Sequence, residues 1–360
     1  MEFVYSARNP QARVAYASFG AMHTVLETVL VGLPEPEARR LSEEIERLVL
    51  ALDARLNRHD AGSLFARINA SQGREAVALD EETFVLLQLC EVFRKNTDGY
   101  FDIAALSPGG TVPAYRLDPA ARSVTLTGAD IVLDAGGFGK GYALDYLFKH
   151  IFEEQGEDAY DAFFVFDADN IVDPQFVREM NKMYDTGEYS ALTSYRNSQN
   201  FCANWISAGY ALWFLRESRF LNRPRTRLGV NCAVSGTGFL ISADVLREEG
   251  GWNYHLLTED IEFSIASAVR GRKIGYCGNA IIYDEQPEHF RQSWDQRLRW
   301  SKGFYQVDAK YTGALLRGCT RGGKAGMSCY DMLMTVAPCN LVTIGSLLLA
   351  VLLGQILGPL

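Results

Sequence analysis

The sequence predicts an α/β protein in which an α+β domain comes first, a partial doubly wound domain follows, and a transmembrane helix ends the chain. Three observations support this prediction: leucines at helical spacing near the N-terminus, a short apolar run that ends in carboxylates at Asp167, and an uncharged stretch at 332–360. The 360 residues are 48% hydrophobic, so two ordinary domains can each bury a core. The formal net charge of -9 argues against nucleic-acid binding, because a nucleic-acid-binding protein needs a basic face.

The N-terminal part predicts helices packed on strands. Residues 25–32 (VLETVLVG) have the composition of a strand. A helix follows, because apolar residues recur at helical spacing with charges between them: Leu41, Ile45, Leu48, Leu52 and Leu56. A second helix is expected from Asp80, a favourable N-cap, to Asn96, and short strands are expected at 124–126 and 131–133.

From residue 159 the pattern changes to that of an open α/β sheet. Residues 162–166 (AFFVF) are typical of a buried parallel strand that delivers carboxylates to the ligand-binding edge of the sheet. Pro174 suits the first turn of a helix that ends near Tyr184. Four further elements are expected: two strands joined by a glycine turn within 230–242, and helices at 257–269 and 287–304.

The C-terminal stretch 332–360 contains no charged residue, and roughly 20 apolar residues suffice to span a bilayer. We therefore expect a transmembrane helix in the inner or plasma membrane, with a buried core helix as the alternative. Basic residues precede the stretch, so the positive-inside rule places the catalytic part in the cytoplasm: Lys302, Lys310, Arg317, Arg321 and Lys324. The N-terminus lacks the apolar segment of a signal peptide, and seven cysteines without a Cys-x-x-Cys pair favour a reducing compartment.

Asp167 and Asp169 flank a single alanine at the end of the expected strand. On an extended backbone their side chains point the same way, and carboxylate oxygens are the ligands that a hard divalent cation prefers. Such a cation can itself hold a diphosphate. Taken alone, an Asp-x-Asp pair is more often a solvated turn, because aspartates are common in turns.

Two more polar groups follow along the chain. Glu259 and Asp260 open an expected helix, where carboxylates also occur simply as caps. Apolar neighbours surround Asp260, which suits a partly desolvated general base. Gln296, Arg299 and Trp300 share one helix face, at positions i, i+3 and i+4. Arginine can neutralise a leaving diphosphate and tryptophan can stack on a sugar, although an ordinary amphipathic helix could contain the same string.

In this order and spacing, these groups resemble the family-2 glycosyltransferases, in the membrane-bound branch that includes cellulose- and hyaluronan-synthase-like enzymes. The matching strings extend over about residues 139–360: DADN at Asp167, NW at Asn204, GTGF at Gly236, LTEDIEF at Leu257, YDEQP at Tyr283 and QRLRW at Gln296. The resemblance implies a GT-A-like fold. It also implies inverting transfer of a sugar from a nucleotide donor, with UDP the expected nucleotide, to a glycan or lipid-linked acceptor.

The resemblance assigns a role to each motif residue. Asp167 and Asp169 would bind Mg²⁺ or Mn²⁺ with the nucleotide diphosphate, and Asp260 would deprotonate the acceptor hydroxyl. The remaining positions would contact the substrates: Glu259, Gly236, Thr237, Gly238, Gln296, Arg299 and Trp300. In this family the strands that bind uridine and ribose precede the Asp-x-Asp strand, and here only residues 139–151 match that region. The first nucleotide-binding half is therefore missing.

The N-terminal part has motifs of its own. A glycine-rich loop at 136–141 lets the backbone approach a ligand closely, and Asp134 and Lys140 flank it with opposite charges, which suits a polar cofactor with a phosphate. Such a loop is often no more than a tight turn. With the upstream strings it resembles the N-terminal half of the FAD:protein FMN transferases, the ApbE family: FGAMHT at Phe19, RLNRHDAGSLFARIN at Arg55, TDGYFDI at Thr97 and LDAGGFGKGYALD at Leu133.

This second resemblance implies magnesium and FAD as cofactors and transfer of FMN to a Ser or Thr of a partner protein. Seven residues would contact FAD: Met22, His59, Tyr100, Phe101, Asp102, Asp134 and Lys140. Gly137 would offer a backbone carbonyl to magnesium. The later half of that family, with its Asp/Thr metal motif, has no match in this sequence.

The two resemblances overlap in one string, GKGYALD at 139–145. We therefore expect a flavin-transferase-like half domain at 1–145, a glycosyltransferase portion at 139–330 and a transmembrane segment at 332–360. Three functions follow: glycosyl transfer, which the motifs favour; FMN transfer; and no activity at all, in a chimera of two half-enzymes joined at this string.

Overall fold

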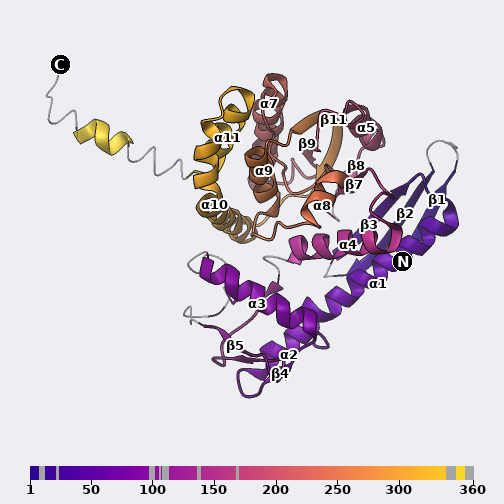
Figure 1. The fold of residues 1–360 in the computed structure, drawn as a ribbon, viewed down its shortest axis with the longest axis vertical. Coiled ribbons are helices and arrows are strands. Elements are labelled where there is room, and N and C mark those ends of the chain that lie inside the picture. The colour runs from indigo at the N-terminus through magenta and orange to yellow at the C-terminus, as the bar shows by residue number, and fades with distance from the viewer. Residues whose placement is uncertain are drawn as a thin grey trace. The chain divides into compact units, whose positions relative to one another are not determined.

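The computed structural model describes residues 1–7, 13–21, 24–96, 102–104, 107, 113–135, 139–167, 170–337 and 346–352 (Figure 1). The chain divides into two compact units. The first contains residues 1–173, 237–257 and 282–285, and the second contains residues 174–236, 258–281 and 286–360. Both units contain helices and strands, which confirms a mixed α/β class.

An antiparallel meander of three strands opens the first unit. β1 (Glu2–Ser6) pairs with β2 (Val14–Ala21), and β2 pairs with β3 (Thr24–Val31). β3 confirms the strand expected at 25–32. Every second residue of β2 is buried, because successive side chains of a strand point to opposite faces of the sheet.

Both helices expected in the N-terminal part are confirmed. α1 (Glu35–Leu56) buries the predicted leucine face, with Ile45 half-buried: Leu41, Leu48, Leu52 and Leu56. α3 (Glu81–Asn96) begins after Asp80, whose Oδ1 accepts a hydrogen bond from the N–H of Thr83 at 2.8 Å. That oxygen gives the first turn of the helix an acceptor that its backbone lacks, as an N-cap does.

A small sheet and a short helix complete the N-terminal core. The sheet has the order β4-β6-β5, with β4 (Val77–Ala78), β6 (Ser123–Leu126) and β5 (Tyr115–Asp118). α2 (Leu64–Ser71) begins at Ser63, whose hydroxyl accepts a hydrogen bond from the N–H of Ala66. The core includes side chains from these elements and from α3: Phe65, Ile68, Leu87, Val124 and Leu133.

The strand expected at 131–133 is wrong. Ile131 and Leu133 are buried in the N-terminal core, as the alternation suggested. The backbone of Leu133, however, exchanges hydrogen bonds of 2.8 and 3.0 Å with the side chain of Asn69. A side-chain amide satisfies the backbone here, so the hydrophobic alternation predicts which residues are buried but not the partner of the backbone.

α4 (Gly139–Gln155) contains the string that fits both resemblances. Tyr142 packs against the N-terminal core. Phe148 packs against Phe163, with ring centroids 5.0 Å apart, and Trp252, at 6.4 Å. One helix therefore makes aromatic contacts on both sides within the first unit.

The apolar strand expected at 162–166 is present as β7 (Ala162–Val165), but its predicted direction is wrong. β7 pairs antiparallel with β10 (Phe239–Ser242). β8 (Ile171–Val172) pairs antiparallel with the end of β11 (Ile274–Asp284), and the sheet order is β7-β10-β9-β11-β8, with β9 (Ala191–Ser198). The expectation of a parallel neighbour rested on the apolar run at 162–166, which does not specify the direction of the strand beside it. α8 (Ala243–Glu249) follows β10.

Helices make up most of the second unit: α5 (Phe176–Tyr184), α6 (Trp205–Arg216), a π-helical turn η2 (Glu217–Asn222), α7 (Arg223–Leu228), α9 (Glu259–Arg270), α10 (Phe290–Cys319) and α11 (Gly323–Val336). α5 and α9 confirm expected helices, and α10 extends well beyond the predicted end at 304. Residues 230–235 form no strand, which corrects half of the strand–turn–strand prediction. Instead, the N–H of Val234 donates to the hydroxyl of Ser264 on α9 at 2.8 Å.

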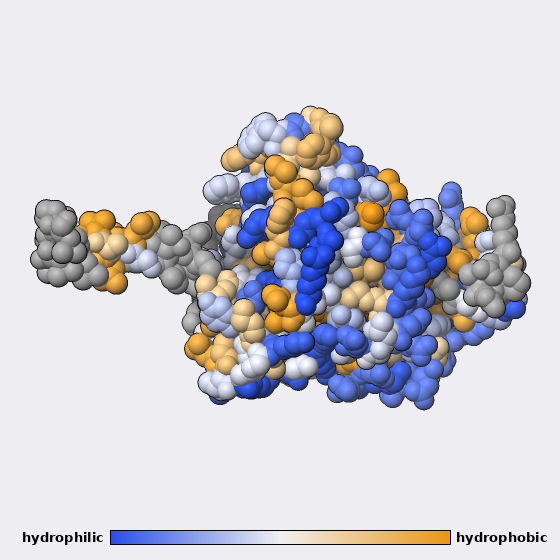
Figure 2. All heavy atoms as spheres, turned by 90° about the horizontal axis from the view of Figure 1, so that it is seen from above, coloured by the Kyte–Doolittle hydropathy of each residue, from blue (hydrophilic) through white to orange (hydrophobic). Residues whose placement is uncertain are grey.

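The described residues contain no helix that is both long and apolar enough to cross a membrane, so the helix expected at 332–360 is not found there. Met332 and Val336 are buried in the packed helix α11, which ends at Val336. A short helix at 346–352 exposes its leucines, which appear orange in Figure 2. Residues 338–345 and 353–360 lie outside the described part of the chain.

Candidate functional site

A buried chain of polar groups holds the loop after β7 in the first unit. The N–H of Asp167 donates to the hydroxyl of Thr237 at 2.7 Å, and that hydroxyl donates to the side-chain oxygen Oδ1 of Asn170. The Asn170 amide donates to Asp284 at 3.0 Å. Thr237, Asn170 and Asp284 are 1%, 7% and 2% exposed, so these bonds form away from water and hold the half-buried Asp167 in place. Asp169 lies outside the described residues.

Asn170 and Asp284 were not predicted as site residues. The signal was present, because each belongs to a quoted string, DADN and YDEQP. Thr237 was predicted to contact the acceptor, and here it also fixes the Asp167 loop. The donor set suits a hard divalent cation, because Asp167 supplies carboxylate oxygens and its backbone N–H is held by the buried chain.

Asp260 lies in the first turn of α9, in the second unit, and is half-buried beside Glu259. Gly236 approaches it closely: a Cβ added there would lie 3.3 Å from Asp260 Oδ2, and the φ of Gly236 is 78°. Only glycine adopts this backbone conformation without strain. The structure therefore brings together two predicted site residues, and the glycine lets the backbone approach the carboxylate closely. Gly238, with a φ of 62°, lies in the loop before β10.

The loop before Gly236 is anchored by two charged side chains that the sequence did not single out. Arg196 Nη1 donates to the Ser235 carbonyl at 2.8 Å and its guanidinium lies 3.9 Å from the ring centroid of Phe214. The Ser235 hydroxyl donates to Glu217 Oε1 at 2.7 Å. Burial raises the pKa of Glu217, although the Ser235 hydrogen bond and nearby arginines act in the opposite direction.

The predicted string on α10 divides between burial and exposure. The Trp300 ring packs against Tyr210 and Phe214, with centroids 5.8 and 6.3 Å apart, while Arg299 is exposed. Gln296 is half-buried, and its Oε1 has no hydrogen-bond partner among the described residues. Trp300 therefore anchors α10 to α6, and the exposed Arg299 is the polar group of this string that a ligand can reach.

α10 crosses the start of α9 at a glycine that sequence reasoning missed. A Cβ on Gly303 would lie 2.5 Å from Thr258 Cγ2, closer than real Cβ atoms approach. Thr258 immediately precedes Glu259 and Asp260, so this contact sets the distance between α10 and the acidic turn. A glycine three residues after Trp300 is the only signal in the sequence.

A second missed residue is Glu262 on α9, which is fully buried. Lys310 Nζ lies 2.5 Å from Glu262 Oε1, and the Tyr311 hydroxyl donates to the same oxygen at 3.3 Å. Lys310 and Tyr311 both belong to α10. This charge pair adds a second connection between the two helices that carry Asp260 and Trp300.

The predicted flavin contacts are placed only in part. The N–H of Asp134 donates to the Ile103 carbonyl at 2.7 Å, which joins the segments that carry Asp134 and Asp102. Asp134 also pairs with Arg58 at 3.3 Å, and His59 is exposed. The other predicted contacts cannot be placed, because these residues, or in the last case the side chain, lie outside the described part of the chain: Met22, Tyr100, Phe101, Gly137 and Lys140.

One cluster of metal-ligating groups occurs among the described residues, formed by Glu44 of α1 with His150 and Glu154 of α4. Its ligand atoms lie within 4.8 Å of one another. Glu44, however, also pairs with Arg40 and Arg47, so its charge is already balanced. We assign no cation to it.

The motif residues from Asp167 to Trp300 all fall within 162–357, the interval matched by the model described as Glycosyl transferase family group 2. The chain belongs to this family. The ApbE family model matches residues 22–160, the part that precedes β7. Both resemblances seen in the sequence are thus confirmed, and the chain contains a transferase domain of the first kind.

Three curated relatives are similar to the glycosyltransferase part. A probable glycosyltransferase, YdaM, of Bacillus subtilis is 28% identical over 121 residues, which are 33% of this chain and 25% of the relative. The beta-monoglucosyldiacylglycerol synthase of a Synechocystis species is 25% identical over 142 residues (39% and 29%). The poly-beta-1,6-N-acetyl-D-glucosamine synthase of Staphylococcus aureus is 27% identical over 178 residues (45% and 42%). The chain thus spans less than half the length of each.

Two solved structures are similar to the flavin-transferase-like part. An ApbE protein from Thermotoga maritima is 22% identical with a TM-score of 0.33, and the match covers 39% of this chain and 53% of that one. The flavin transferase ApbE from Vibrio cholerae is 14% identical with a TM-score of 0.35, covering 45% and 64%.

Proposed function

We propose that this chain is an inverting, metal-dependent glycosyltransferase that moves a sugar from a nucleotide donor, UDP in the first instance, to a glycan or lipid-linked acceptor. The observation that carries the proposal is the close approach of Gly236 to the half-buried Asp260, which brings together residues of two separate motifs. A partly desolvated carboxylate can accept a proton from an acceptor hydroxyl. The acceptor classes are supported by the diacylglycerol and glucosamine-polymer names of two relatives.

Each residue of the proposed site performs one step. Asp260 takes the proton from the acceptor hydroxyl as the new glycosidic bond forms and the bond to the nucleotide diphosphate breaks, with the electron pair leaving on the diphosphate. Mg²⁺ or Mn²⁺, held by Asp167 and Asp169, would supply positive charge to that diphosphate when bound. Arg299 adds a further positive charge, and Gln296, three residues before it on the same face of α10, would contact the diphosphate or the acceptor.

We also propose a GT-A-like arrangement for this part and a location at the membrane with the catalytic part on the cytoplasmic side. Lys302 and the other basic residues before 332 support this orientation through the positive-inside rule. Gly236 and Thr237 are consecutive in sequence, so the loop beside Asp260 continues directly into the residue that holds the Asp167 loop.

The test is release of UDP from UDP-glucose and UDP-N-acetylglucosamine by the purified full chain with Mn²⁺ or Mg²⁺. We expect Asp260→Asn to lower turnover by roughly 100-fold or more, the usual contribution of general base catalysis, without lowering the melting temperature. Asp185→Asn is the matched control, because Asp185 is an exposed carboxylate at the end of α5 in the same unit. Wild-type turnover that survives Asp260→Asn would refute the proposed role.

A second candidate function is FMN transfer from FAD, supported by the ApbE match over 22–160 and by the hydrogen bond that joins the Asp134 and Ile103 backbones. It predicts FAD binding with magnesium that Asp134→Ala abolishes. If neither a UDP-sugar nor FAD raises the melting temperature of the chain, the third possibility is favoured, which is a chimera of two half-enzymes without activity.

A further inference from the structure

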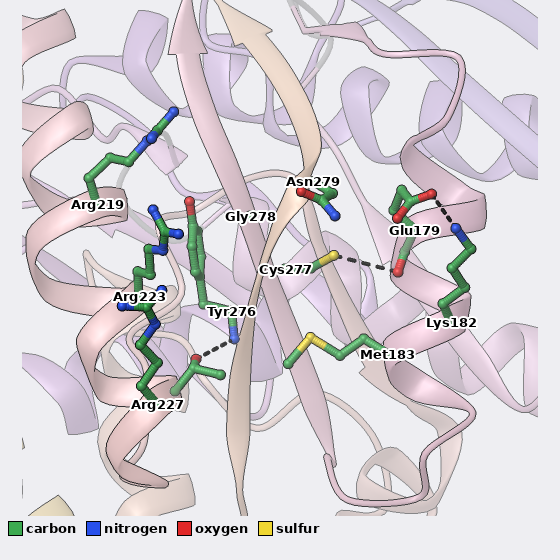
Figure 3. A pocket seen from close by; sticks show the side chains of 11 residues that line it. Glu179, Lys182, Met183, Arg219, Arg223, Arg227, Tyr276, Cys277, Gly278 and Asn279 are labelled. Carbon is green, nitrogen blue, oxygen red and sulfur yellow. Dashed lines mark hydrogen bonds and ion pairs between the residues drawn. The ribbon is translucent and has the colours of Figure 1, made fainter.

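A basic groove of about 580 Å³ lies within the second unit, apart from every residue assigned above to sugar transfer (Figure 3). α5 forms one wall, η2 and α7 form the other, and β11 forms the floor. Six residues define it: Arg219, Arg223, Arg227, Lys182, Tyr276 and Asn279. We refer to these six as the basic groove.

Three arginines follow one another along a single wall. Arg219, Arg223 and Arg227 are four residues apart along the continuous η2–α7 helix, so about 6 Å of helix rise separates each from the next. Figure 3 shows the three side chains in a row beside Tyr276. A ligand lying along this wall would meet a guanidinium at each step.

The positive charge of the groove is not balanced by carboxylates. Among the described residues Arg223 and Arg227 make no ion pair, and Arg219 stacks on the Tyr195 ring at 5.4 Å. The one carboxylate in the lining, Glu179, is already held by Lys182 at 2.6 Å. Like charges four residues apart on a helix destabilise it. The chain has a net charge of -9, yet none of its described carboxylates forms an ion pair with Arg223 or Arg227.

The walls are fixed to the floor, so the groove is preformed. The N–H of Tyr276 donates to the Thr226 hydroxyl at 2.9 Å, which ties β11 to α7. The Cys277 thiol donates to the Glu179 carbonyl at 3.5 Å, which ties β11 to α5. Burial raises the pKa of Tyr276 to about 12, so its hydroxyl keeps the proton that a hydrogen-bond donor needs. A preformed site loses less entropy when a ligand binds.

The wall also contains an unusual backbone element. η2 is a π-helical turn between α6 and α7, and it contributes Arg219 to the groove. Such turns are rare and are found frequently at functional sites. This observation is independent of the charge pattern, and it concerns the same wall.

We propose that the basic groove binds a ligand that carries two or more phosphate groups. Guanidinium groups match phosphate in charge and in geometry, and the row of three fits a ligand with phosphates in series. Tyr276 and Asn279 line the floor, and the opposite wall adds no net charge because Lys182 is paired with Glu179. The shared chemistry is phosphate, which a soluble oligophosphate or a phospholipid headgroup could supply. The proposal does not depend on sugar transfer.

The test measures binding by the full chain, in low salt and without metal, by titration calorimetry with inorganic tripolyphosphate. We expect wild-type protein to bind and Arg223→Gln/Arg227→Gln to bind roughly 100-fold more weakly, about tenfold for each charge-assisted contact removed. Arg291→Gln is the control, because Arg291 is exposed on α10 of the same unit and outside the groove. Equal binding by the wild type and the double variant would overturn the proposal.

A second arm distinguishes the source of the phosphate. Sedimentation with vesicles that contain cardiolipin, whose headgroup carries two phosphates, compared with phosphatidylcholine vesicles, detects a headgroup site. Vesicle binding that requires Arg223 and Arg227, without tripolyphosphate binding, assigns the groove to a lipid headgroup, and the reverse pattern assigns it to a soluble ligand. Wild-type protein that binds neither probe contradicts the proposal.

The unliganded melting temperature provides a check on folding. We expect Arg223→Gln/Arg227→Gln to melt at or above the wild-type temperature, because the substitutions relieve repulsion between like charges. A lower melting temperature without ligand would mean that the arginines serve the fold, and that outcome would also overturn the proposal.

Discussion

The polar residues of the flavin-transferase-like region and those of the glycosyltransferase region are held in different ways. In the first, Asp134 and Arg58 pair at the surface, with side chains 32% and 29% exposed. In the second, Glu262 is fully buried against Lys310, and Thr237 is 1% exposed within a chain of hydrogen bonds. Burying a polar group is unfavourable unless it forms a hydrogen bond or an ion pair. We call the buried, bonded polar groups of the second region its buried polar scaffold. The motif residues of that region lie on this scaffold.

The largest effect that tests this difference is expected at Lys310. Lys310→Met leaves the buried Glu262 carboxylate without its ammonium partner, and we expect the free energy of unfolding to fall by about 3 kcal/mol. Arg58→Met, the matched change in the first region, removes a partner from an exposed pair and should cost about 1 kcal/mol or less. Urea unfolding of the two variants measures both values.

A double variant separates the pair from the packing of the lysine. Lys310→Met/Glu262→Gln removes the buried charge as well, so it should recover most of the lost stability. If the double variant is as unstable as Lys310→Met, the cost belongs to lost contacts of the lysine stem. Equal losses in Lys310→Met and Arg58→Met would remove the contrast between the regions.

The next effect tests how tightly α4 packs against the segment that contains Tyr254. A Cβ on Gly141 would lie 2.4 Å from the backbone oxygen of Tyr254, which cannot rotate away. We therefore expect Gly141→Ala to lower the free energy of unfolding by about 2 kcal/mol, even though alanine favours a helix. Gly209→Ala on α6 meets nothing within 4 Å and should instead stabilise the protein by about 0.5–1 kcal/mol.

The thermal unfolding of these two variants has a clear adverse outcome. A Gly141→Ala protein as stable as Gly209→Ala would show that α4 is not held against the Tyr254 segment in solution. The string GKGYALD would then join two parts that do not pack on each other.

How far the sequence predicts this molecule depends on the range of the interaction. The leucine face of α1 and the Asp80 cap follow from neighbours along the chain, and both are confirmed. Gly236 and Asp260 were each named from a quoted motif, but the motifs did not predict that the two would be in contact. The pair of Glu262 and Lys310 joins positions 48 residues apart, and no local pattern states which charges meet. The prediction that β7 is a parallel strand was wrong for the same reason, because a short apolar run does not specify which strand pairs with it or in which direction.

The smallest effect is a difference in pH dependence between one carboxylate of each region. Burial acts to raise the pKa of Asp80, but the hydrogen bonds from Thr83 and the charge of Arg55 hold it below the ordinary 3.8. A depressed pKa contributes stability above 3.8 that disappears as the pH falls through the folded value. Burial raises the pKa of Glu217 above the ordinary 4.5, so its contribution is present below 4.5 and is lost as the pH rises through the folded value.

The two carboxylates therefore predict opposite trends for their amide variants. Asp80→Asn should be less stable than wild type near neutral pH, with the gap closing below about 3.8, whereas Glu217→Gln should gain on wild type as the pH rises above 4.5. Melting temperatures from pH 3 to 8 measure both, with Glu285→Gln as an exposed control. For Glu217 the gain is about 1.4 kcal/mol for each unit of pKa difference between the folded and unfolded states. If the melting temperature of Glu217→Gln changes with pH in parallel with that of the wild type, the Glu217 carboxylate is not desolvated. The buried polar scaffold would then include Ser235 but not Glu217.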